Sequence, residues 1–314
     1  MRILITDGLA KEAVELLKKE HEVVMHEATP EELLKMVGDF EAVIVRSRSK
    51  ITREVIEAGK KLVVLGRAGI GVDNIDVPFA AGKGIKVVNA PLGATLSVAE
   101  LAIGHMLSLA RALPYGDRET KAGNWPKNAM KGAEISGKVL GLIGGGNIAK
   151  ATAGMAKNGF GMKILAYDPY LTAEQVAAFG GKKVELDELC RSADYISLHI
   201  PKTPETKHII NAERLAMMKP SARIINCARG GTIDENALYD ALKEGKIAGA
   251  ALDVFESEPC KASPLFELPN IFATPHIGAN TSEGQKRAGI TTAEQVLIAL
   301  AGEEPEFWVN RPKN

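Results

Sequence analysis

Short apolar runs alternate with helix-length segments over roughly the first 90 residues. The apolar runs lie at residues 3–6, 23–26, 42–46, 62–66 and 86–89. Strands separated by helix-length segments are typical of parallel sheets, because a parallel pair needs a crossover connection. The pattern therefore predicts an α/β domain in this part of the chain.

A long apolar segment follows, from about residue 97 to residue 113. Ser97 and Glu100 have the spacing of a capping box at its start, and Pro114 is expected to end the helix. Because the segment is apolar nearly all round, we expect it to be buried either between domains or between subunits. The pattern leaves both alternatives open.

A second α/β series occupies the rest of the chain. Its six expected strands lie at residues 138–143, 164–167, 195–199, 223–226, 248–253 and 271–273. Helix-length spacers between them predict right-handed crossovers and a doubly wound parallel sheet, the Rossmann arrangement. One more helix is expected at about residues 282–300.

Composition and charge narrow the class of partner. The chain has 314 residues, so two domains are expected, and its 39 basic residues equal its 39 acidic ones. This balance argues against a nucleic-acid or membrane-surface partner and favours a small molecule. Cys190, Cys227 and Cys260 lie far apart without metal-ligand spacing, so we expect free thiols and no metal. With no apolar run of signal-peptide or membrane-spanning length, we expect a cytoplasmic protein.

A glycine-rich turn lies between a predicted strand and a helix. Residues 144–149 read Gly-Gly-Gly-Asn-Ile-Ala, which fits the dinucleotide fingerprint. Gly144 would allow the tight turn, Gly146 the approach of the pyrophosphate, and Ala149 close packing of helix on strand. Asp168 follows at about the spacing of the ribose-binding acid, and its charge would repel a 2′-phosphate. The turn therefore predicts a dinucleotide site that prefers NAD to NADP.

Three polar side chains follow successive strands of the second series. Arg229 follows the strand at 223–226, Glu258 the strand that ends near 253, and His276 the strand at 271–273. The carboxyl ends of parallel strands meet at one edge, where ligands bind. Arginine can hold a carboxylate in a fork, histidine can transfer a proton near neutral pH, and a carboxylate beside it favours the imidazolium. The trio suits hydride chemistry at a hydroxy acid, although Glu256 competes with Glu258 on spacing alone.

Eight short segments spread over nearly the whole chain have the sequence motifs of one enzyme family. They lie at residues 45–47, 66–74, 144–149, 167–169, 226–231, 250–255, 258–259 and 275–279. In these segments the chain resembles the D-2-hydroxyacid dehydrogenase family, and within it the D-3-phosphoglycerate dehydrogenase branch. The resemblance implies oxidation of 3-phosphoglycerate with NAD, feeding serine synthesis, and it selects Glu258 as the partner of His276. It also implies a homodimer built partly on the long helix.

The resemblance assigns domains and contacts as well. It implies a split, flavodoxin-like substrate domain of residues 1–93 and 283–314, and a Rossmann NAD-binding domain of residues 94–282. Residues 69–71 would present backbone N–H groups to the substrate carboxylate, and Arg46, Arg67 and, with weaker support, Lys127 would meet its phosphate. The substrate set is Arg46, Arg67, Gly69, Gly71 and Lys127. The expected cofactor contacts are Ile70, Gly144, Gly146, Asn147, Ile148, Asp168, Ile200, Cys227, Ala228, Asp253 and Gly278.

Departures from the family pattern keep alternatives open. Asn147 stands where relatives commonly carry arginine, so a neutral side chain replaces a charged contact to the pyrophosphate. Lys127 also stands where relatives often carry arginine, so the substrate phosphate would meet a single ammonium charge and not a two-pronged guanidinium group. A hydroxypyruvate or glyoxylate reductase is therefore an alternative, and an NAD-sensing scaffold like the corepressors of this fold is another. The chain stops at Asn314, so we expect no serine feedback through the C-terminal regulatory domains of longer relatives.

Overall fold

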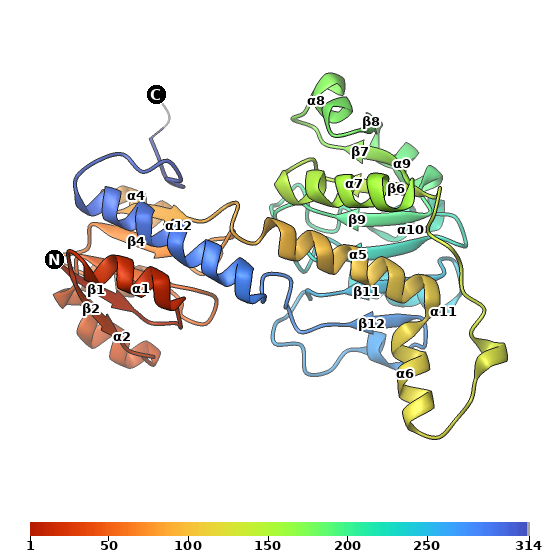
Figure 1. Ribbon diagram of the computed structural model, residues 1–314, viewed down its shortest axis with the longest axis horizontal. Helices are drawn as coiled ribbons and strands as arrows, with labels where there is room; N and C mark the ends of the chain where they lie inside the picture. The colour runs from red at the N-terminus through yellow and green to blue at the C-terminus, as the bar shows by residue number, and fades with distance from the viewer. Residues whose placement is uncertain (313–314) are drawn as a thin grey trace. The chain divides into compact units, whose positions relative to one another are not determined.

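The computed structural model describes residues 1–312 and contains two compact units. The split unit consists of Met1–Thr95 with Ala279–Asn314, and the central unit consists of Leu96–Gly278. Each unit has its own parallel sheet, as Figure 1 shows by the colours of the strands.

The split unit is built on a five-stranded parallel sheet in the order β2-β1-β3-β4-β5. This is the flavodoxin-like strand order, whose reversal point lies between β1 and β3. In chain order the elements are β1 (Arg2–Ile5), α1 (Lys11–Lys18), β2 (Glu22–Met25), α2 (Pro30–Met36), η1 (Val37–Asp39), β3 (Ala42–Val45), α3 (Arg53–Ala58), β4 (Val64–Arg67), α4 (Val77–Gly82), β5 (Lys86–Asn89) and α12 (Ser282–Leu300).

The C-terminal helix α12 completes one face of this sheet. Every residue of β3 is buried, as expected for a parallel strand covered on both faces. A Cβ on Gly66 in β4 would lie 2.8 Å from Val296 and 2.9 Å from Thr292, both on α12. Glycine at this position therefore allows helix and strand to pack closely.

The central unit has a seven-stranded parallel sheet in the order β12-β11-β10-β9-β6-β7-β8. Read from β6, this is the Rossmann order with one further strand, and the direction reverses between β6 and β9. The predicted α/β doubly wound fold is thus confirmed. The elements are α5 (Thr95–Arg111), α6 (Leu113–Lys121), η2 (Lys127–Ala129), β6 (Val139–Ile143), α7 (Asn147–Phe160), β7 (Lys163–Tyr167), α8 (Ala173–Ala178), β8 (Gly181–Lys183), α9 (Leu186–Ser192), β9 (Tyr195–Leu198), α10 (Ala212–Met217), β10 (Arg223–Asn226), α11 (Glu235–Lys243), β11 (Gly249–Leu252), η3 (Pro264–Glu267) and β12 (Ile271–Ala273).

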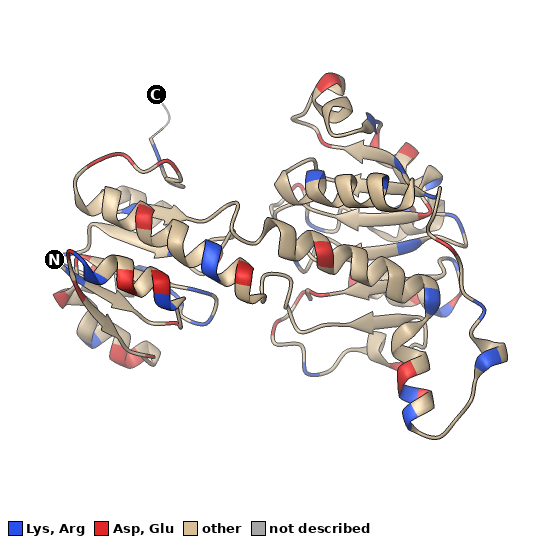
Figure 2. Ribbon diagram, viewed as in Figure 1, with Lys and Arg blue, Asp and Glu red and all other residues tan. Residues whose placement is uncertain are grey.

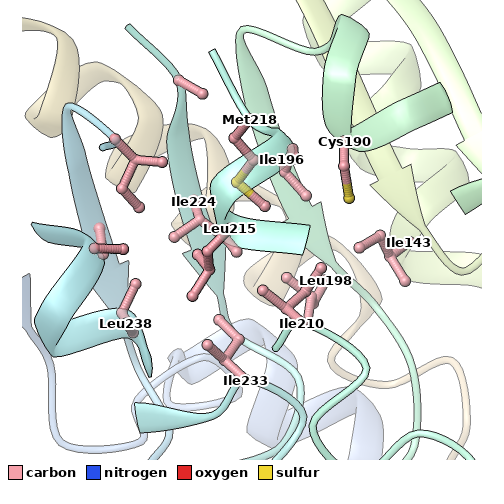
Figure 3. Close-up of a cluster of buried hydrophobic side chains, with 14 of the residues drawn as sticks. Ile143, Cys190, Ile196, Leu198, Ile210, Leu215, Met218, Ile224, Ile233 and Leu238 are labelled. Carbon is pink, nitrogen blue, oxygen red and sulfur yellow. The ribbon is translucent and has the colours of Figure 1, made fainter. Parts of the chain in front are cut away.

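An aliphatic core fixes the strands that carry the candidate residues. Leu198 on β9 and Ile224 on β10 point into a cluster with Leu215 of α10 and Leu238 of α11 (Figure 3). All four side chains are almost completely removed from solvent. Because such interiors are close-packed, the carboxyl ends of β9 and β10 have little freedom to shift.

Three sequence predictions are corrected. The central sheet has seven strands rather than six, because β8, a short Gly-Lys-Lys strand, lacks an apolar run. The long helix α5 begins at Thr95, so Ser97 lies buried inside it and the Ser97–Glu100 capping box is wrong. Pro114 does not end the helix: Ala112 breaks it with a φ of 49°, and Pro114 lies in the first turn of α6, where proline is tolerated.

Basic and acidic residues are interspersed over both units in the view of Figure 2. Over residues 1–312, no single helix is long and apolar enough to cross a membrane. The pair α5 and α6 passes on length and composition together, but it is bent by 64°.

Candidate active site

The glycine-rich turn joins β6 to α7 at the reversal point of the central sheet. Gly144 has a φ of 98°, and a Cβ there would lie 2.5 Å from the carbonyl oxygen of His199, which follows β9. Gly146 is the N-cap of α7, and no described atom lies within 4 Å of a Cβ built on it. Packing within the described chain therefore explains Gly144 but not Gly146. The open space at a helix N-terminus fits a pyrophosphate.

Asp168 is held beside this turn by three backbone donors. Its carboxylate accepts from the N–H groups of Gly145 at 2.8 Å, Tyr170 at 2.8 Å and Leu171 at 3.2 Å. Two carboxylate oxygens have about four lone-pair sites, so acceptor capacity is left for a ribose hydroxyl. The residues of the turn and Asp168 together fit the adenosine and pyrophosphate parts of NAD.

The loop that carries Arg229 is organised by Asn226. The buried Asn226 amide donates to the carbonyl oxygen of Arg229 at 3.0 Å and to the Thr232 hydroxyl at 3.1 Å. Its oxygen accepts from the Ala228 N–H at 3.0 Å. The carbonyl group of Phe255 lies against Gly230 where a Cβ would stand, so a larger residue would displace the loop.

His276 and Glu258 form a hydrogen-bonded pair. Nδ1 of His276 lies 2.7 Å from Oε2 of Glu258, and Oε1 of Glu258 accepts from the Phe255 N–H at 3.0 Å. Burial alone would raise the pKa of Glu258, but the His276 bond, the Phe255 N–H and the charge of Arg229 lower it overall. The carboxylate therefore orients the imidazole through Nδ1, and Nε2 is the ring nitrogen that can exchange a proton with a ligand.

Asp253 anchors the loop of His276. His276 has a φ of 54°, and its N–H donates to the carbonyl oxygen of Asp253 at 2.8 Å. The fully buried Asp253 carboxylate accepts from the N–H groups of Ile277 and Gly278, each at 2.8 Å. A left-handed conformation at a non-glycine residue costs of order 1–3 kcal/mol and persists only where its surroundings fix it.

The other predicted cofactor contacts of the central unit follow the same strand ends. Asn147 and Ile148 open α7, Ile200 follows β9 beside Gly144, and Cys227 and Ala228 follow β10. Gly278 closes the unit after β12. The predicted catalytic residues Arg229, Glu258 and His276 thus lie with these residues along the carboxyl edge of one sheet.

Four predicted substrate residues, with Ile70, lie at the carboxyl ends of β3 and β4 in the split unit. Arg46 follows β3 at the reversal point, and its N–H donates to the Asp7 carboxylate at 2.7 Å. The guanidinium of Arg67 lies against Gly69, in the place of a Cβ, and Gly69 has a φ of 158°. The Asn89 amide donates to the carbonyl oxygen of Ile70 at 2.6 Å. Gly71 follows directly in the same loop.

Within residues 1–312, no hydrogen bond or ion pair joins Lys127 to the predicted catalytic residues. Lys127 is exposed in η2, on an arm that we define as residues 113–134. Helix α6 within this arm has no buried residue, and Trp125 is 81% exposed.

Four residues that organise these loops were not predicted as site residues. Two are Asn226 and Asp7, described above; the others are His105 and Thr274, whose Nε2 and Oγ1 lie 3.3 Å apart, with the Thr274 hydroxyl donating to Asp253 at 2.6 Å. Each acts through hydrogen bonds to residues distant in sequence or through loop geometry. Single polar residues of this kind give no periodic signal, although Asn226 lies inside a matched segment.

Comparison with known proteins identifies relatives over the whole chain. Residues 103–278 match the family described as D-isomer specific 2-hydroxyacid dehydrogenase, NAD binding domain. A D-3-phosphoglycerate dehydrogenase of Methanocaldococcus jannaschii is 51% identical over 99% of the chain, and the match covers 60% of that relative. A hydroxypyruvate reductase of Thermotoga maritima is 48% identical, covering 95% of the chain and 98% of that relative.

Solved structures agree with this family. The D-lactate dehydrogenase of Aquifex aeolicus complexed with NAD and lactic acid has a TM-score of 0.87 and 29% identity, with both chains covered over 100% of their lengths. The chain spans 60% and 56% of the lengths of the phosphoglycerate dehydrogenases from Methanocaldococcus jannaschii and Synechocystis, respectively.

Proposed function

The chain belongs to the D-isomer specific 2-hydroxyacid dehydrogenase family and carries its NAD-binding domain, and we propose that it oxidises 3-phosphoglycerate to 3-phosphohydroxypyruvate with NAD. The observation that carries the hydroxy-acid chemistry is the His276–Glu258 pair, joined at 2.7 Å at the sheet edge where Arg229 also emerges. The choice of the phosphorylated acid depends instead on Arg46 and Arg67 of the split unit. An acid–base pair next to a carboxylate-binding arginine suits chemistry at C2 of a hydroxy acid.

The side chains divide the chemistry between them. The bound cofactor supplies the hydride acceptor. Arg229 holds the substrate carboxylate and the C2 oxygen in a bidentate fork, since guanidinium geometry matches two oxygens. His276 removes the hydroxyl proton through Nε2, and Glu258 stabilises the imidazolium that results. In the reverse direction His276 returns the proton to the developing alkoxide.

We assign substrate binding to the split unit. Arg46 follows β3 and Arg67 is the last residue of the adjacent β4, and the glycine-rich residues 69–71 form the loop beyond β4. Two guanidinium groups at one sheet edge suit a phosphate, and backbone N–H groups of a glycine loop suit a carboxylate. The three-carbon phosphorylated acid carries both groups.

We further propose a cytoplasmic homodimer. The arm of residues 113–134 has a helix without buried residues and an exposed tryptophan, which is the kind of surface that a second copy covers. Because Lys127 lies on this arm, its contribution to substrate binding would depend on the dimer.

A second candidate is reduction of hydroxypyruvate. It is favoured by the Thermotoga maritima hydroxypyruvate reductase, which the match covers over 98% of its length. That reaction uses Arg229, Glu258 and His276 in the same roles and needs no phosphate contact.

The test is NADH oxidation with 3-phosphohydroxypyruvate, hydroxypyruvate and glyoxylate at matched concentrations. We expect preference for the phosphorylated acid, and we expect Arg46→Ala to lower kcat/KM for that acid alone by about 10–100-fold, the value of a charged hydrogen bond. Arg53→Ala is the matched control, since Arg53 is an exposed arginine of α3 in the same unit. Preference for hydroxypyruvate would select the second candidate. NADH binding without turnover of any acid would refute the enzyme and favour an NAD-sensing scaffold.

A further inference from the structure

One buried imidazole of the central unit touches both catalytic loops. His105 lies on α5 with 3% of its surface exposed. Its Nδ1 lies 3.5 Å from Sγ of Cys227, and its Nε2 lies 3.3 Å from Oγ1 of Thr274. The ring also packs edge-on against Phe272 at 5.0 Å between centroids. Cys227 stands two residues before Arg229, and Thr274 stands two residues before His276.

The hydrogen-bond partners permit one arrangement of protons. The Asp253 carboxylate accepts hydrogen bonds from the N–H groups of Ile277 and Gly278. Since a carboxylate can only accept, the Thr274 hydroxyl donates its hydrogen to Asp253, at 2.6 Å. The oxygen of Thr274 has then given its only hydrogen and must accept from Nε2–H of His105. The ring is left with a bare Nδ1 toward the Cys227 thiol.

The electrostatic setting keeps this arrangement in place. Burial lowers the pKa of His105, and the opposing charge of Asp253 does not reverse this shift. Burial raises the pKa of the Cys227 thiol, with Asp253 adding to the shift, so the thiol keeps its hydrogen and donates to Nδ1. The contacts around the ring are Cys227, Thr274 and Phe272, with Asp253 as the nearby charge. The imidazole is therefore neutral near pH 7.

We propose that His105 is a positioning residue that fixes the Arg229 loop relative to the His276 loop through Cys227 and Thr274. This inference rests on the proposed function, because it requires Arg229 and His276 to act on one substrate. A chain of donors runs from the Cys227 thiol through the imidazole and the Thr274 hydroxyl to Asp253, which anchors the left-handed His276.

Kinetics of three variants of α5 test the proposal. His105→Leu removes both bonds, and we expect kcat to fall by about 10–100-fold, because small misplacements of reacting groups have effects of that size. The primary isotope effect with C4-deuterated NADH should rise, while the NADH dissociation constant stays within about 3-fold, less than 1 kcal/mol. His105→Gln can still donate to Thr274 and should recover most of kcat. Met106→Ala is the control, since Met106 is the fully buried neighbour on the same helix and lies outside the network.

A double-mutant cycle of His105 and Thr274, measured in kcat, distinguishes a positioning role of His105 from general destabilisation of the protein. Thr274→Val should also lower kcat, and the His105→Leu/Thr274→Val double variant should be no slower than His105→Leu, because both changes break one chain. Additive losses, a wild-type isotope effect in His105→Leu, or a His105→Gln variant no faster than His105→Leu would overturn the proposal. An equal isotope-effect change in Met106→Ala would also overturn it.

A measurement without turnover distinguishes failure of this inference from failure of the proposed function. In ¹⁵N-histidine-labelled wild-type protein, His105 should be neutral with its proton on Nε2, both alone and with NADH. A proton on Nδ1 or a charged ring at neutral pH would overturn the network even in an active enzyme. Absence of turnover with any 2-keto acid, with the expected tautomer present, would refute the proposed function and leave the network supported.

Discussion

Replacing Asp7 by Asn should loosen the Arg46 loop of the split unit. The Asp7 carboxylate accepts four hydrogen bonds, from the N–H of Arg46 at 2.7 Å, the N–H and hydroxyl of Ser49 at 3.2 and 2.6 Å, and Nε of Arg48 at 3.3 Å. All four partners are donors in this arrangement, and Asp7 is only 7% exposed. An asparagine can keep two of these bonds with its oxygen, but its amino group must then face the remaining donors.

The expected cost follows from the two bonds that are lost. Each hydrogen bond to a buried charge contributes about 1.5–3 kcal/mol, but the Ser49 hydroxyl can turn and accept, which recovers part of this. The Arg48 side chain is half exposed, so its bond contributes only about 0–1 kcal/mol. We therefore expect Asp7→Asn to destabilise the split unit by about 1–3 kcal/mol at neutral pH.

The pH dependence has a definite sign. Burial alone would raise the pKa of Asp7, but the Ser49 hydroxyl, the N–H groups of Arg46 and Ser49, and the Arg48 charge lower it overall. A carboxyl group with a depressed pKa in the folded state contributes stability above its unfolded value of about 3.9 and loses it as pH falls through the folded value. The difference between wild type and Asp7→Asn should therefore be constant from about pH 6 to pH 8 and shrink below about pH 4.

The assay is hydrogen exchange of residues 46–49, supported by urea unfolding at pH 7 and pH 3.5. Exchange reports the loop directly, which matters because two units make a single unfolding free energy poorly defined. The matched control is Glu27→Gln, since Glu27 is an exposed partner of Arg48 and should leave exchange unchanged. Equal protection in Asp7→Asn and wild type at pH 7, or a difference that persists undiminished at pH 3.5, would refute the reasoning.

Four further outcomes are expected. His276→Ala should lower kcat by about 10²–10⁴-fold, the usual contribution of a general acid–base group, with NADH affinity by fluorescence titration nearly unchanged; wild-type turnover would remove His276 from the mechanism. Glu258→Gln should lower kcat more than Glu256→Gln, which is its matched control, and equal losses would contradict the pairing seen at 2.7 Å. Asp168→Asn should narrow the ratio of kcat/KM for NAD over NADP, and an unchanged ratio would contradict ribose binding. Gly144→Ala should lower the melting temperature and weaken NADH binding, because its φ of 98° and the nearby His199 carbonyl oxygen exclude a Cβ; a variant as stable as wild type would argue against this geometry.

The strands could be predicted where burial made them apolar. Ala42–Val45 is buried at every position and reads as a continuous apolar run, whereas Gly181–Lys183 lies at the sheet edge with partial burial and gives no such run. Pro114 was ambiguous for a different reason, since proline both ends a helix and fits the first turn of the next one. The left-handed Ala112 that separates α5 from α6 has no sequence signal of its own.

The placement of the polar residues could be predicted only as far as strand direction determines it. Parallel strands carry Arg229, Glu258 and His276 to one edge whatever the loops do, and this much follows from the pattern. The bonds that orient them do not follow, because they join distant parts of the chain: His105 lies 122 residues from Cys227 and 169 from Thr274. A histidine inside an apolar helix looks the same whether it joins loops or merely fills space.

The choice between Glu256 and Glu258 shows where spacing stops being informative. The two residues lie on one loop, and a loop has no periodicity from which the direction of a side chain could be inferred. In the structure Glu258 turns to His276, whereas Oε1 of Glu256 lies 3.0 Å from Nε2 of His208, and its N–H donates to Glu235 at 2.6 Å. Glu256 is therefore engaged by residues near α11 and is not available to His276. His208 is left-handed as well, with a φ of 48°, so the backbone conformation of the histidines does not distinguish the two pairs; the hydrogen bonds from neighbouring residues that hold each carboxylate do.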